Sequence, residues 1–372
     1  MEPLNVLDYE PLARERMHPA AWAYLCAGAE DEVTLRENRA AFERLRLVPR
    51  VLRGVAAPDL RTTVLGTPVE VPVLVAPMGV HGLAHPEGEL ATARGAGEAG
   101  TLMAVSTVSS HGLEEISASA RGPLWFQLYV YRSRALAERL VRRAERAGYR
   151  AVVLTVDSPR WGRKERFLRV AASLPPGADA ASIDGEAGEE DLAPAALGWE
   201  DVGWLRSISS LPLVLKGILH PEDAALATEH GAAGIVVSNH GGRQLDGAPA
   251  SMEALPSVVE AVGGRAEVYL DGGVRRGTDA LKALALGARA VFVGRPILWG
   301  LAVGGAEGVR RVLGLLRGEL ELAMALCGQG SVGKLDAGLV SRSRRALGDA
   351  ALSGGARSGR RPRRGAGAVG AR

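Results

Sequence analysis

Short runs of apolar and β-branched residues recur along the chain, and each run is followed by a segment with helical spacing of its apolar residues. This alternation predicts βαβ units and a parallel sheet. Eight parallel strands with helical crossovers can close into a barrel. The predicted strands are Val71–Ala76, Leu102–Ser106, Leu124–Tyr129, Ala151–Asp157, Pro212–Lys216, Gly234–Asn239, Glu267–Asp271 and Ala290–Gly294. The sequence therefore predicts the α/β fold class and, within it, a (β/α)8 TIM barrel.

The segments between these runs have the pattern of amphipathic helices. Apolar residues recur at helical spacing in RALAERLVRRAERA, and Pro-Glu-Asp opens another helix. The predicted helices are Glu87–Ala99, Arg134–Ala147, Pro221–His230 and Thr278–Leu286. Residues 1–65 also have a helical pattern, and we expect an N-terminal helical segment before the barrel.

One connection is much longer than the others. About forty residues separate the predicted fourth strand from a helix near Trp199, and residues 171–197 are rich in Ala, Gly, Asp and Glu. Because this loop leaves the C-terminal end of a barrel strand, we expect it to be a lid loop. We expect one barrel domain over residues 1–352 and a basic, disordered tail over residues 353–372.

Charge and composition exclude several classes of function. The tail from Arg342 onward carries a formal charge of +8, so the rest of the chain carries −5 within the total of +3. A mildly acidic body argues against nucleic-acid binding. No apolar run reaches the roughly 18 residues of a membrane span, and no signal peptide is evident, so we expect a cytoplasmic protein. Cys26 and Cys327 form no ligand cluster, and we expect no metal site.

Polar or turn-forming residues follow every predicted strand, at the end where barrel enzymes carry their chemistry. In chain order these are Pro77, Met78, Gly79, Ser106, Gln127, Tyr129, Thr155, Asp157, Lys216, Ser238, His240, Arg243, Asp271, Gly272, Gly273, Arg275, Gly294 and Arg295. Chance does not readily place such residues at all eight ends. The sequence therefore predicts an active site at this face of the barrel.

The last two strand ends predict a phosphate site, which is the usual use of these two loops in such barrels. Gly272, Gly273 and Gly294 let backbone N–H groups approach an anion, and Arg275 and Arg295 supply positive charge. We therefore expect a phosphorylated ligand. Tight turns with surface arginines are the alternative interpretation.

Lys216, at the end of the fifth predicted strand, fits two kinds of chemistry. It could form a Schiff base with a carbonyl substrate. It could instead be a fixed cation beside the N1–C2 edge of a flavin, with Gln127, Thr155 and Ser106 bonding the other ring heteroatoms.

His240 lies between a strand end and two glycines in SNHGGRQLDG. A lone histidine is often structural, but this position favours a base that works near neutral pH. Asp157 is its candidate partner, because the fourth predicted strand, which ends at Asp157, opens onto the same mouth of the barrel. Arg243 offers a planar fork for a carboxylate. Together these residues predict a site for the oxidation of 2-hydroxy acids.

The chain also resembles a known family at these positions. SNHGGRQLDG (238–247), DGGVRRGTD (271–279), APMGVHGLAHPEGE (76–89) and LTVDSPRWGRK (154–164) are similar to motifs of the FMN-dependent 2-hydroxy-acid oxidases and dehydrogenases. That family includes glycolate oxidase, lactate oxidase, mandelate dehydrogenase and flavocytochrome b2. The matching stretches run from residue 24 to about residue 300 in family order, and the first two are highly specific.

The resemblance implies FMN as the cofactor and a role for each matching position. The flavin ring would be contacted by Pro77, Met78, Gly79, Ser106, Gln127, Thr155, Lys216 and Ser238. The ribityl chain and phosphate would be held by Asp271, Gly272, Gly273, Arg275, Gly294 and Arg295. Tyr24 and Tyr129 would contact the substrate, and Arg243 would bind its carboxylate. His240 would be the base, oriented by Asp157, in the oxidation of an (S)-2-hydroxy acid to the 2-oxo acid.

The chain departs from the family pattern around the substrate. Lys164 stands where the family usually has a second carboxylate-binding arginine, and a lysine donates as a point charge. Either Lys164 binds the carboxylate more weakly, or Arg163 substitutes, or the carboxylate is bound differently. Gly79, Val108 and Trp161 differ from the usual family residues, which implies a pocket reshaped for a bulkier substituent such as an aryl group.

The leading hypothesis is an enzyme that oxidises a small-molecule 2-hydroxy acid and is reoxidised by oxygen or a soluble electron acceptor. A second hypothesis is a flavin-dependent isomerase or a Schiff-base aldolase acting through Lys216. A third is a non-catalytic flavin-binding protein, which the presence of Lys164 suggests. The resemblance also implies a homo-oligomer, either a tetramer or an octamer.

Overall fold

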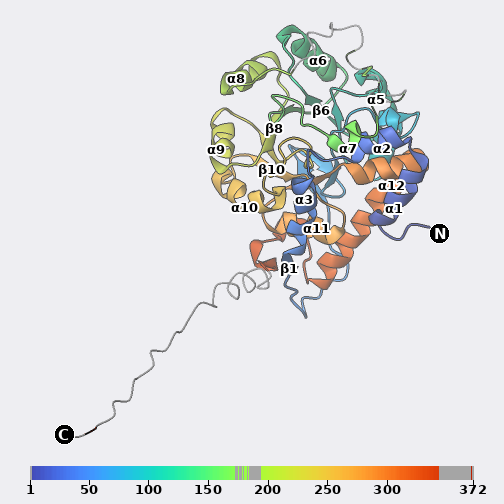
Figure 1. The fold of residues 1–372 in the computed structure, drawn as a ribbon. Coiled ribbons are helices and arrows are strands. Elements are labelled where there is room, and N and C mark those ends of the chain that lie inside the picture. The colour runs from blue at the N-terminus through green and yellow to red at the C-terminus, as the bar shows by residue number, and fades with distance from the viewer. Residues whose placement is uncertain are drawn as a thin grey trace.

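Eight parallel strands form the centre of the molecule. The computed structural model describes residues 2–171, 194–342 and the single positions 175, 178, 180, 181, 183 and 370. The central strands are β4 (Val73–Val75), β5 (Met103–Ser106), β6 (Leu124–Leu128), β7 (Val152–Thr155), β8 (Leu213–Ile218), β9 (Gly234–Val237), β10 (Glu267–Leu270) and β11 (Ala290–Val293). They close into a barrel in the order β10–β11–β4–β5–β6–β7–β8–β9 (Figure 1). All eight predicted strands are present, so the predicted TIM barrel is confirmed.

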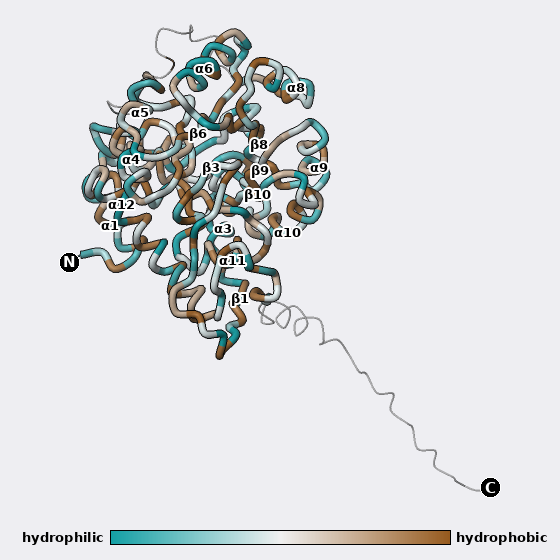
Figure 2. The backbone as a smooth tube through the Cα atoms, turned by 180° about the vertical axis from the view of Figure 1, so that it is seen from behind, coloured by the Kyte–Doolittle hydropathy of each residue, from teal (hydrophilic) through white to brown (hydrophobic). Residues whose placement is uncertain are grey.

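Helices surround the barrel. They are α4 (Gly88–Glu98), α5 (Leu113–Ser119), α6 (Arg134–Arg146), α7 (Glu165–Leu168), α8 (Trp199–Ile208), α9 (Pro221–Glu229), α10 (Ser251–Val262), α11 (Gly277–Ala285) and α12 (Arg295–Leu326). The four predicted helices match α4, α6, α9 and α11 to within one residue at each end. The sequence analysis did not predict α12, which is kinked at Gly304 and Gly305. Seen from behind, the strands carry mainly hydrophobic residues, whereas the outer helices alternate between hydrophobic and hydrophilic residues (Figure 2).

The N-terminal segment is helical over a shorter stretch than expected. Its helices are α1 (Tyr9–Arg16), α2 (Pro19–Cys26) and α3 (Val33–Glu43). The segment beyond Glu43 contains β1 (Leu45–Leu47), which pairs with β12 (Val340–Arg342), and a hairpin of β2 (Thr62–Val64) and β3 (Thr67–Val69). The hairpin turn has positive φ at both Leu65 and Gly66, which suits a two-residue connection between twisted strands. Short single-turn helices lie at Val6–Asp8, His81–Leu83, Val332–Lys334 and Ala337–Leu339.

The barrel interior changes from apolar to polar along its axis. At one end, hairpin residues Val64 and Val69 join an apolar cluster with barrel residues that include Leu74, Trp125, Val153, Val214, Val236, Tyr269 and Phe292. Side chains alternate between the two faces of a strand, so the next inward position lies two residues further on. Those positions carry the polar side chains Gln127, Thr155, Lys216, Ser238 and Asp271. The hairpin thus plugs one end of the barrel, and polar groups are collected at the other.

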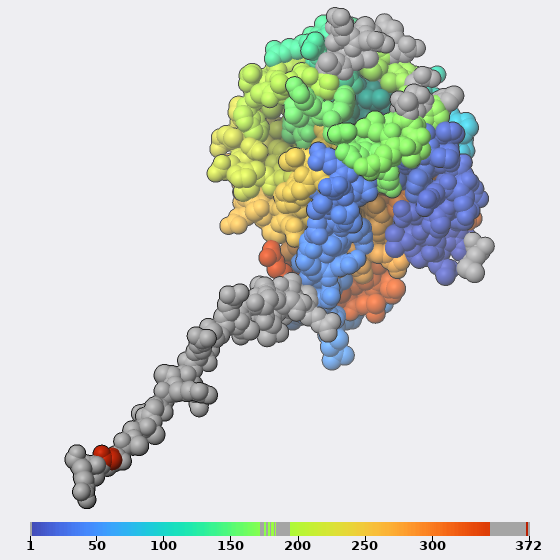
Figure 3. All heavy atoms as spheres, in the orientation of Figure 1, coloured from blue at the N-terminus to red at the C-terminus, as the bar shows by residue number. Residues whose placement is uncertain are grey.

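The long connection after β7 is only partly described. Its first part contains α7, whose Arg166 donates to the carbonyl of Cys26 at 2.6 Å and pairs with Glu32 at 3.0 Å. These contacts explain why this part of the connection lies against the N-terminal segment (Figure 3). Most of the predicted lid, residues 171–197, and nearly all of the predicted tail, residues 353–372, lie outside the described residues. No helix in the described part of the chain is long and apolar enough to cross a membrane.

Candidate functional site

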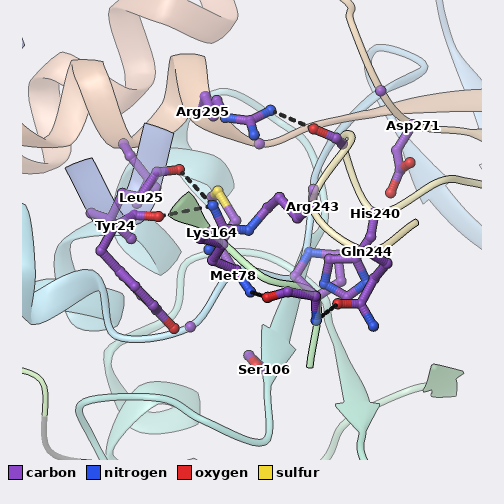
Figure 4. A pocket seen from close by; sticks show the side chains of 18 of the residues that line it. Tyr24, Leu25, Met78, Ser106, Lys164, His240, Arg243, Gln244, Asp271 and Arg295 are labelled. Carbon is purple, nitrogen blue, oxygen red and sulfur yellow. Dashed lines mark hydrogen bonds between the residues drawn. The ribbon is translucent and has the colours of Figure 1, made fainter. Parts of the chain in front are cut away.

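A cavity of about 480 Å³ opens at the C-terminal ends of the barrel strands. It is lined by strand ends, by the N-terminal segment and by the residues that follow β7 (Figure 4). All but four of the candidate site residues line this cavity. The other four, which are linked to the lining by hydrogen bonds directly or through one another, are Gln127, Thr155, Asp157 and Ser238. The structure therefore brings together the residues that the sequence predicted for one site.

His240 lies between a carboxylate and the cavity. Its Nδ1 is 3.0 Å from Oδ1 of Asp157, and its Nε2 is 3.3 Å from the hydroxyl of Tyr129. Because a carboxylate accepts hydrogen bonds, Asp157 favours the tautomer with the proton on Nδ1. This leaves Nε2, on the cavity side, able to accept a proton.

Burial and nearby charges favour a neutral imidazole at His240 and an ionised carboxylate at Asp157. Burial lowers the pKa of His240, and the positive charge of Lys216 lowers it further. The negative charge of Asp157 raises this pKa, but the lowering effects are larger. Burial acts to raise the pKa of Asp157, but His240 and Lys216 outweigh it and hold that pKa below its usual value. A neutral imidazole beside a carboxylate can take up a proton and share the resulting charge.

Two cationic side chains face another part of the cavity. The guanidinium of Arg243 donates to the backbone carbonyls of Tyr24 and Ala27 at 2.9 and 2.8 Å and lies over the Tyr24 ring. Lys164 donates to the carbonyl of Gly162 at 3.0 Å. Neither cation forms an ion pair among the described residues. Arg163, the other candidate for this role, has a side chain that is 70% exposed and lies 3.7 Å from Glu165. The geometry thus favours Lys164 as the second carboxylate-binding group.

A row of polar side chains runs from the cavity wall into the barrel interior. Ser106 donates to Gln127 at 2.9 Å, and the amide of Gln127 donates to Thr155 at 2.9 Å. Beside this row, Lys216 donates to Ser238 at 2.9 Å and pairs with Asp271 at 3.0 Å, with both side chains of the ion pair buried. The ion pair favours the interpretation of Lys216 as a fixed cation over a Schiff-base nucleophile.

The far end of the cavity is strongly electropositive. Arg275 and Arg295 are partly buried, and neither forms an ion pair with a carboxylate in the described ranges. Burial lowers the pKa of Arg295 to about 9, with further lowering by Arg243 and Arg275, and it lowers the pKa of Arg275 to about 10. The Nε of Arg295 is buried without a partner among the described residues. A bound anion would stabilise such a cluster of partly buried cations.

The backbone beside these arginines makes a turn that depends on glycine. Gly272 and Gly273 have φ values of +90° and +88°, a conformation that favours glycine. A Cβ on Gly273 would lie 2.2 Å from the backbone oxygen of Asn38. The need for glycine at this turn therefore comes from the close approach of α3, whereas from the sequence these glycines were assigned to an anion site.

Sequence reasoning missed Gln244 as a site residue. It lines the cavity, donates to the carbonyl of Asp157 at 2.9 Å and accepts from the backbone N–H of Gly162 at 3.0 Å. It thereby holds the segment after β7 against the loop that carries His240. The available signal was its place directly after Arg243 in the most specific motif.

The chain matches the FMN-dependent dehydrogenase family over residues 13–342. It belongs to the FMN-dependent 2-hydroxy-acid oxidase and dehydrogenase family. It is 52% identical to an L-lactate oxidase of Nostoc sp. over 90% of this chain and 97% of that protein. It is 48% identical to a glycolate oxidase of Spinacia oleracea over 88% and 93% of the two chains. A crystal structure of mandelate oxidase superposes with a TM-score of 0.87 at 44% identity, over 92% of this chain and 99% of that chain.

The family uses FMN, and the cavity has the chemistry to hold it. Arg295 and Arg275, which form no ion pair among the described residues, meet the need of a phosphate for positive charge. The buried Nε of Arg295 has no partner there. Asp271 has a buried oxygen with no partner among the described residues, and it faces the same cavity as an acceptor for a hydroxyl. The protein is therefore an FMN-dependent oxidoreductase whose described residues fit the cofactor from phosphate to ring.

Proposed function

We propose that this protein oxidises an (S)-2-hydroxy acid to the 2-oxo acid, with His240 as the base. The observation that carries the proposal is the placement of His240, backed by Asp157, on the same cavity as the two unpaired cations Arg243 and Lys164. Oxidation removes two electrons and two protons, one proton from the carbon and one from its hydroxyl, and leaves a carbonyl. Bound FMN supplies the acceptor for the electron pair.

In this proposal, Arg243 and Lys164 bind the substrate carboxylate. Arg243 donates from one nitrogen to the carbonyls of Tyr24 and Ala27, and these bonds fix the plane of its guanidinium. Its remaining N–H groups are available to the ligand. Lys164 adds a second positive charge on a flexible stem. With the carboxylate held there, the hydroxyl-bearing carbon has a fixed position relative to Nε2 of His240.

His240 takes one of the two hydrogens as a proton on Nε2, and Asp157 stabilises the resulting cation. Tyr129 assists as a neutral hydrogen-bond donor, because burial raises the pKa of its phenol. Its hydroxyl lies within reach of Nε2 and faces the cavity, so it can bond the substrate oxygen as that oxygen becomes a carbonyl. Tyr24 lines the opposite wall and contacts the substrate near its carboxylate.

The electrons then pass to oxygen or to a soluble acceptor. The relatives at 52% and 48% identity and the superposed structure are all named oxidases, which supports oxygen. Cytoplasmic localisation and a homo-oligomeric state stay predictions from the sequence.

The substrate that we propose carries an apolar group on its second carbon. Val108, Trp161, Phe167 and Leu168 give the cavity an apolar wall, and the ring of Trp161 packs edge-on against Tyr129 at 5.2 Å. An apolar wall gains little from glycolate, which has no side chain, and more from an alkyl or aryl substituent. We therefore expect a higher kcat/KM for (S)-mandelate than for glycolate.

The first test is to mix the yellow holoenzyme anaerobically with lactate, glycolate and (S)-mandelate and to follow the flavin absorbance. Bleaching by at least one acid, followed by recovery and hydrogen peroxide on readmission of air, is the expected result. His240→Gln is expected to abolish bleaching, whereas His230→Gln, which changes a histidine stacked on Trp199 away from the cavity, is not. Flavin that no 2-hydroxy acid bleaches would refute the proposed activity, and glycolate as the best substrate would refute the proposed apolar specificity.

A further inference from the structure

The backbone of His240 has an unusual conformation. Its φ is +59°, and the next two residues, Gly241 and Gly242, follow with φ of +64° and +73°. Glycine adopts this conformation freely, but a β-carbon makes it unfavourable. A histidine keeps such a conformation only where its neighbours impose it.

Asn239, the residue before His240, is where much of that constraint is applied. Its side-chain oxygen accepts from the N–H of Gly242 at 3.0 Å, which closes the left-handed turn across His240. Its amide nitrogen donates to the carbonyl of Pro249 at 3.0 Å, which ties the turn to the end of the same loop. Because one neighbour only donates and the other only accepts, they fix which end of the amide is oxygen and which is nitrogen.

The remaining hydrogen-bonding groups of the Asn239 side chain pair with Asn38, which lies 201 residues earlier on α3. Each amide donates to the oxygen of the other at 2.8 Å, so the two side chains form a closed pair. Asn38 and Asn239 are 2% and 4% exposed, and the oxygen of Asn38 also accepts from the N–H of Ser251 at 3.3 Å. In this buried setting, water does not replace a lost partner cheaply.

We infer that Asn38 is a positioning residue for His240, because its amide pair with Asn239 holds the left-handed turn that aims the imidazole at the cavity. The inference rests on the proposed role of His240 as the base. It gives the N-terminal helix α3 a part in the chemistry, although Asn38 does not line the cavity.

The inference predicts a specific form of coupling. Removal of the Asn38 amide leaves one N–H and one lone pair of the Asn239 side chain without a partner, so the turn can relax and displace the imidazole. Small displacements of a catalytic group cost about 10² in rate. In Asn38→Ala we therefore expect about a 10- to 100-fold loss of the rate of flavin reduction at saturating substrate, with little change in KM.

A double-mutant cycle with His240→Gln tests this coupling in the full-length holoenzyme. Flavin reduction is measured in single turnovers without oxygen, so that slow variants remain measurable. If Asn38 acts through His240, Asn38→Ala slows the wild-type enzyme but adds no further loss to His240→Gln. An equal loss in both backgrounds would overturn the inference, because it would show that Asn38 acts independently of the base.

Thr34→Val is the matched control. Thr34 lies one turn earlier on α3, is fully buried, and donates to the carbonyl of Ala248 in the same loop at 3.0 Å. Its near-isosteric replacement removes one hydrogen bond between the same helix and the same loop. We expect it to keep the rate of flavin reduction within about twofold, and a loss equal to that of Asn38→Ala would overturn the inference.

A readout independent of turnover is the nitrogen-15 NMR spectrum of the histidines, with His240 assigned from His240→Gln. The holoenzyme is expected to show an Nδ1-protonated His240, and Asn38→Ala is expected to show a mixture of tautomers as the bond to Asp157 loosens. An unchanged spectrum would overturn the inference. If Asn38→Ala does not retain FMN, Asn38→Ser is measured instead. Loss of FMN in both variants would also overturn it, because the role of Asn38 would then be in stability.

The same experiments separate failure of the inference from failure of the proposed function. If His240→Gln reduces its flavin as fast as the wild type, His240 is not the base and the proposed mechanism fails. If His240→Gln is slow and the Asn38→Ala loss is additive, the mechanism stands and only the inference fails.

Discussion

Lys164 and Arg243 face the same cavity with no carboxylate partner among the described residues, and the charge of one acts on the other. Burial, with the added repulsion of Arg243, lowers the pKa of Lys164 to about 8. Two like charges in a half-buried space are unfavourable unless an anion joins them. The pair is therefore suited to a substrate carboxylate, and its charge changes within an accessible pH range.

Substrate capture should weaken as the pH rises through about 8. Lys164 is cationic below that pKa and neutral above it, so the attraction for a carboxylate is present at lower pH and lost at higher pH. We expect kcat/KM to fall above pH 8 mainly through a rise in KM. The pH profile of kcat/KM reports groups of the free enzyme and provides the measurement.

Lys164→Arg is the matched variant for this prediction. A guanidinium stays charged across the accessible range, so the alkaline fall in kcat/KM should move to higher pH or vanish. Lys164→Met should show below pH 8 the raised KM that the wild type reaches only above it, and it should remove the same limb. An alkaline limb that is identical in all three proteins would assign it to another group.

Asp157→Asn should cost at least about 10² in the rate of flavin reduction, since general-base catalysis contributes about 10²- to 10⁴-fold. The amide can donate to Nδ1 and so favour the wrong tautomer, and it cannot stabilise the imidazolium. FMN content should not change, because Asp157 lies behind His240 and does not line the cavity. Asp246→Asn is the control, since that carboxylate accepts from the N–H groups of Val33 and Thr34 instead. Equal rate losses in both variants would contradict the proposed role of Asp157.

The barrel and most of its site were accessible from the sequence because both depend on local patterns. Apolar runs marked the strands, and the change from Trp125 to Gln127 within β6 marked the point where the interior becomes polar. The polar strand ends meet at one mouth in any barrel of this topology. That rule places His240 and Asp157 at the same mouth, and the structure adds the 3.0 Å between Nδ1 and Oδ1.

The features that the sequence analysis missed depend on contacts between distant segments. Residues beyond Glu43 were expected to be helical, but β1 is stabilised by pairing with β12 some 300 residues later, which no local pattern reveals. The partnership of Asn38 with Asn239 is of the same kind, since nothing near Asn38 marks it as part of the site. Gln244 was missed because its partners lie in the segment after β7, 82 and 87 residues earlier in the sequence.

If Arg275 binds the phosphate, its removal should lower the affinity for FMN and leave the affinity for riboflavin nearly unchanged. Arg275→Ala removes one of the partly buried guanidinium groups and should weaken FMN binding about 10- to 100-fold, the range for a lost hydrogen bond between charged groups. Riboflavin lacks the phosphate, so its affinity should change little. Arg276→Ala is the neighbouring control, because that residue pairs with Glu319 at 3.2 Å and does not line the cavity. Equal weakening of both flavins in Arg275→Ala would contradict a phosphate site here.

A last prediction separates backbone strain from steric clash at the phosphate turn. Gly273 and Gly264 both have positive φ, at +88° and +77°, but only Gly273 is crowded. A Cβ there would meet the backbone oxygen of Asn38 at 2.2 Å, whereas a Cβ at Gly264 would meet nothing within 4 Å. Gly264→Ala should therefore lower the free energy of unfolding by only the conformational cost, about 1 to 2 kcal/mol.

Gly273→Ala adds a clash with main chain, which cannot rotate away as a side chain can. Forced repacking costs a further 1 to 3 kcal/mol or so, for a total of about 2 to 5 kcal/mol. Because the turn must move away from Asn38, FMN affinity should fall as well, whereas Gly264→Ala should bind FMN normally. Chemical denaturation of the FMN-free proteins, together with FMN titration, measures both effects. Matching losses in the two variants would mean that the close approach of α3 to this turn does not contribute to the cofactor site.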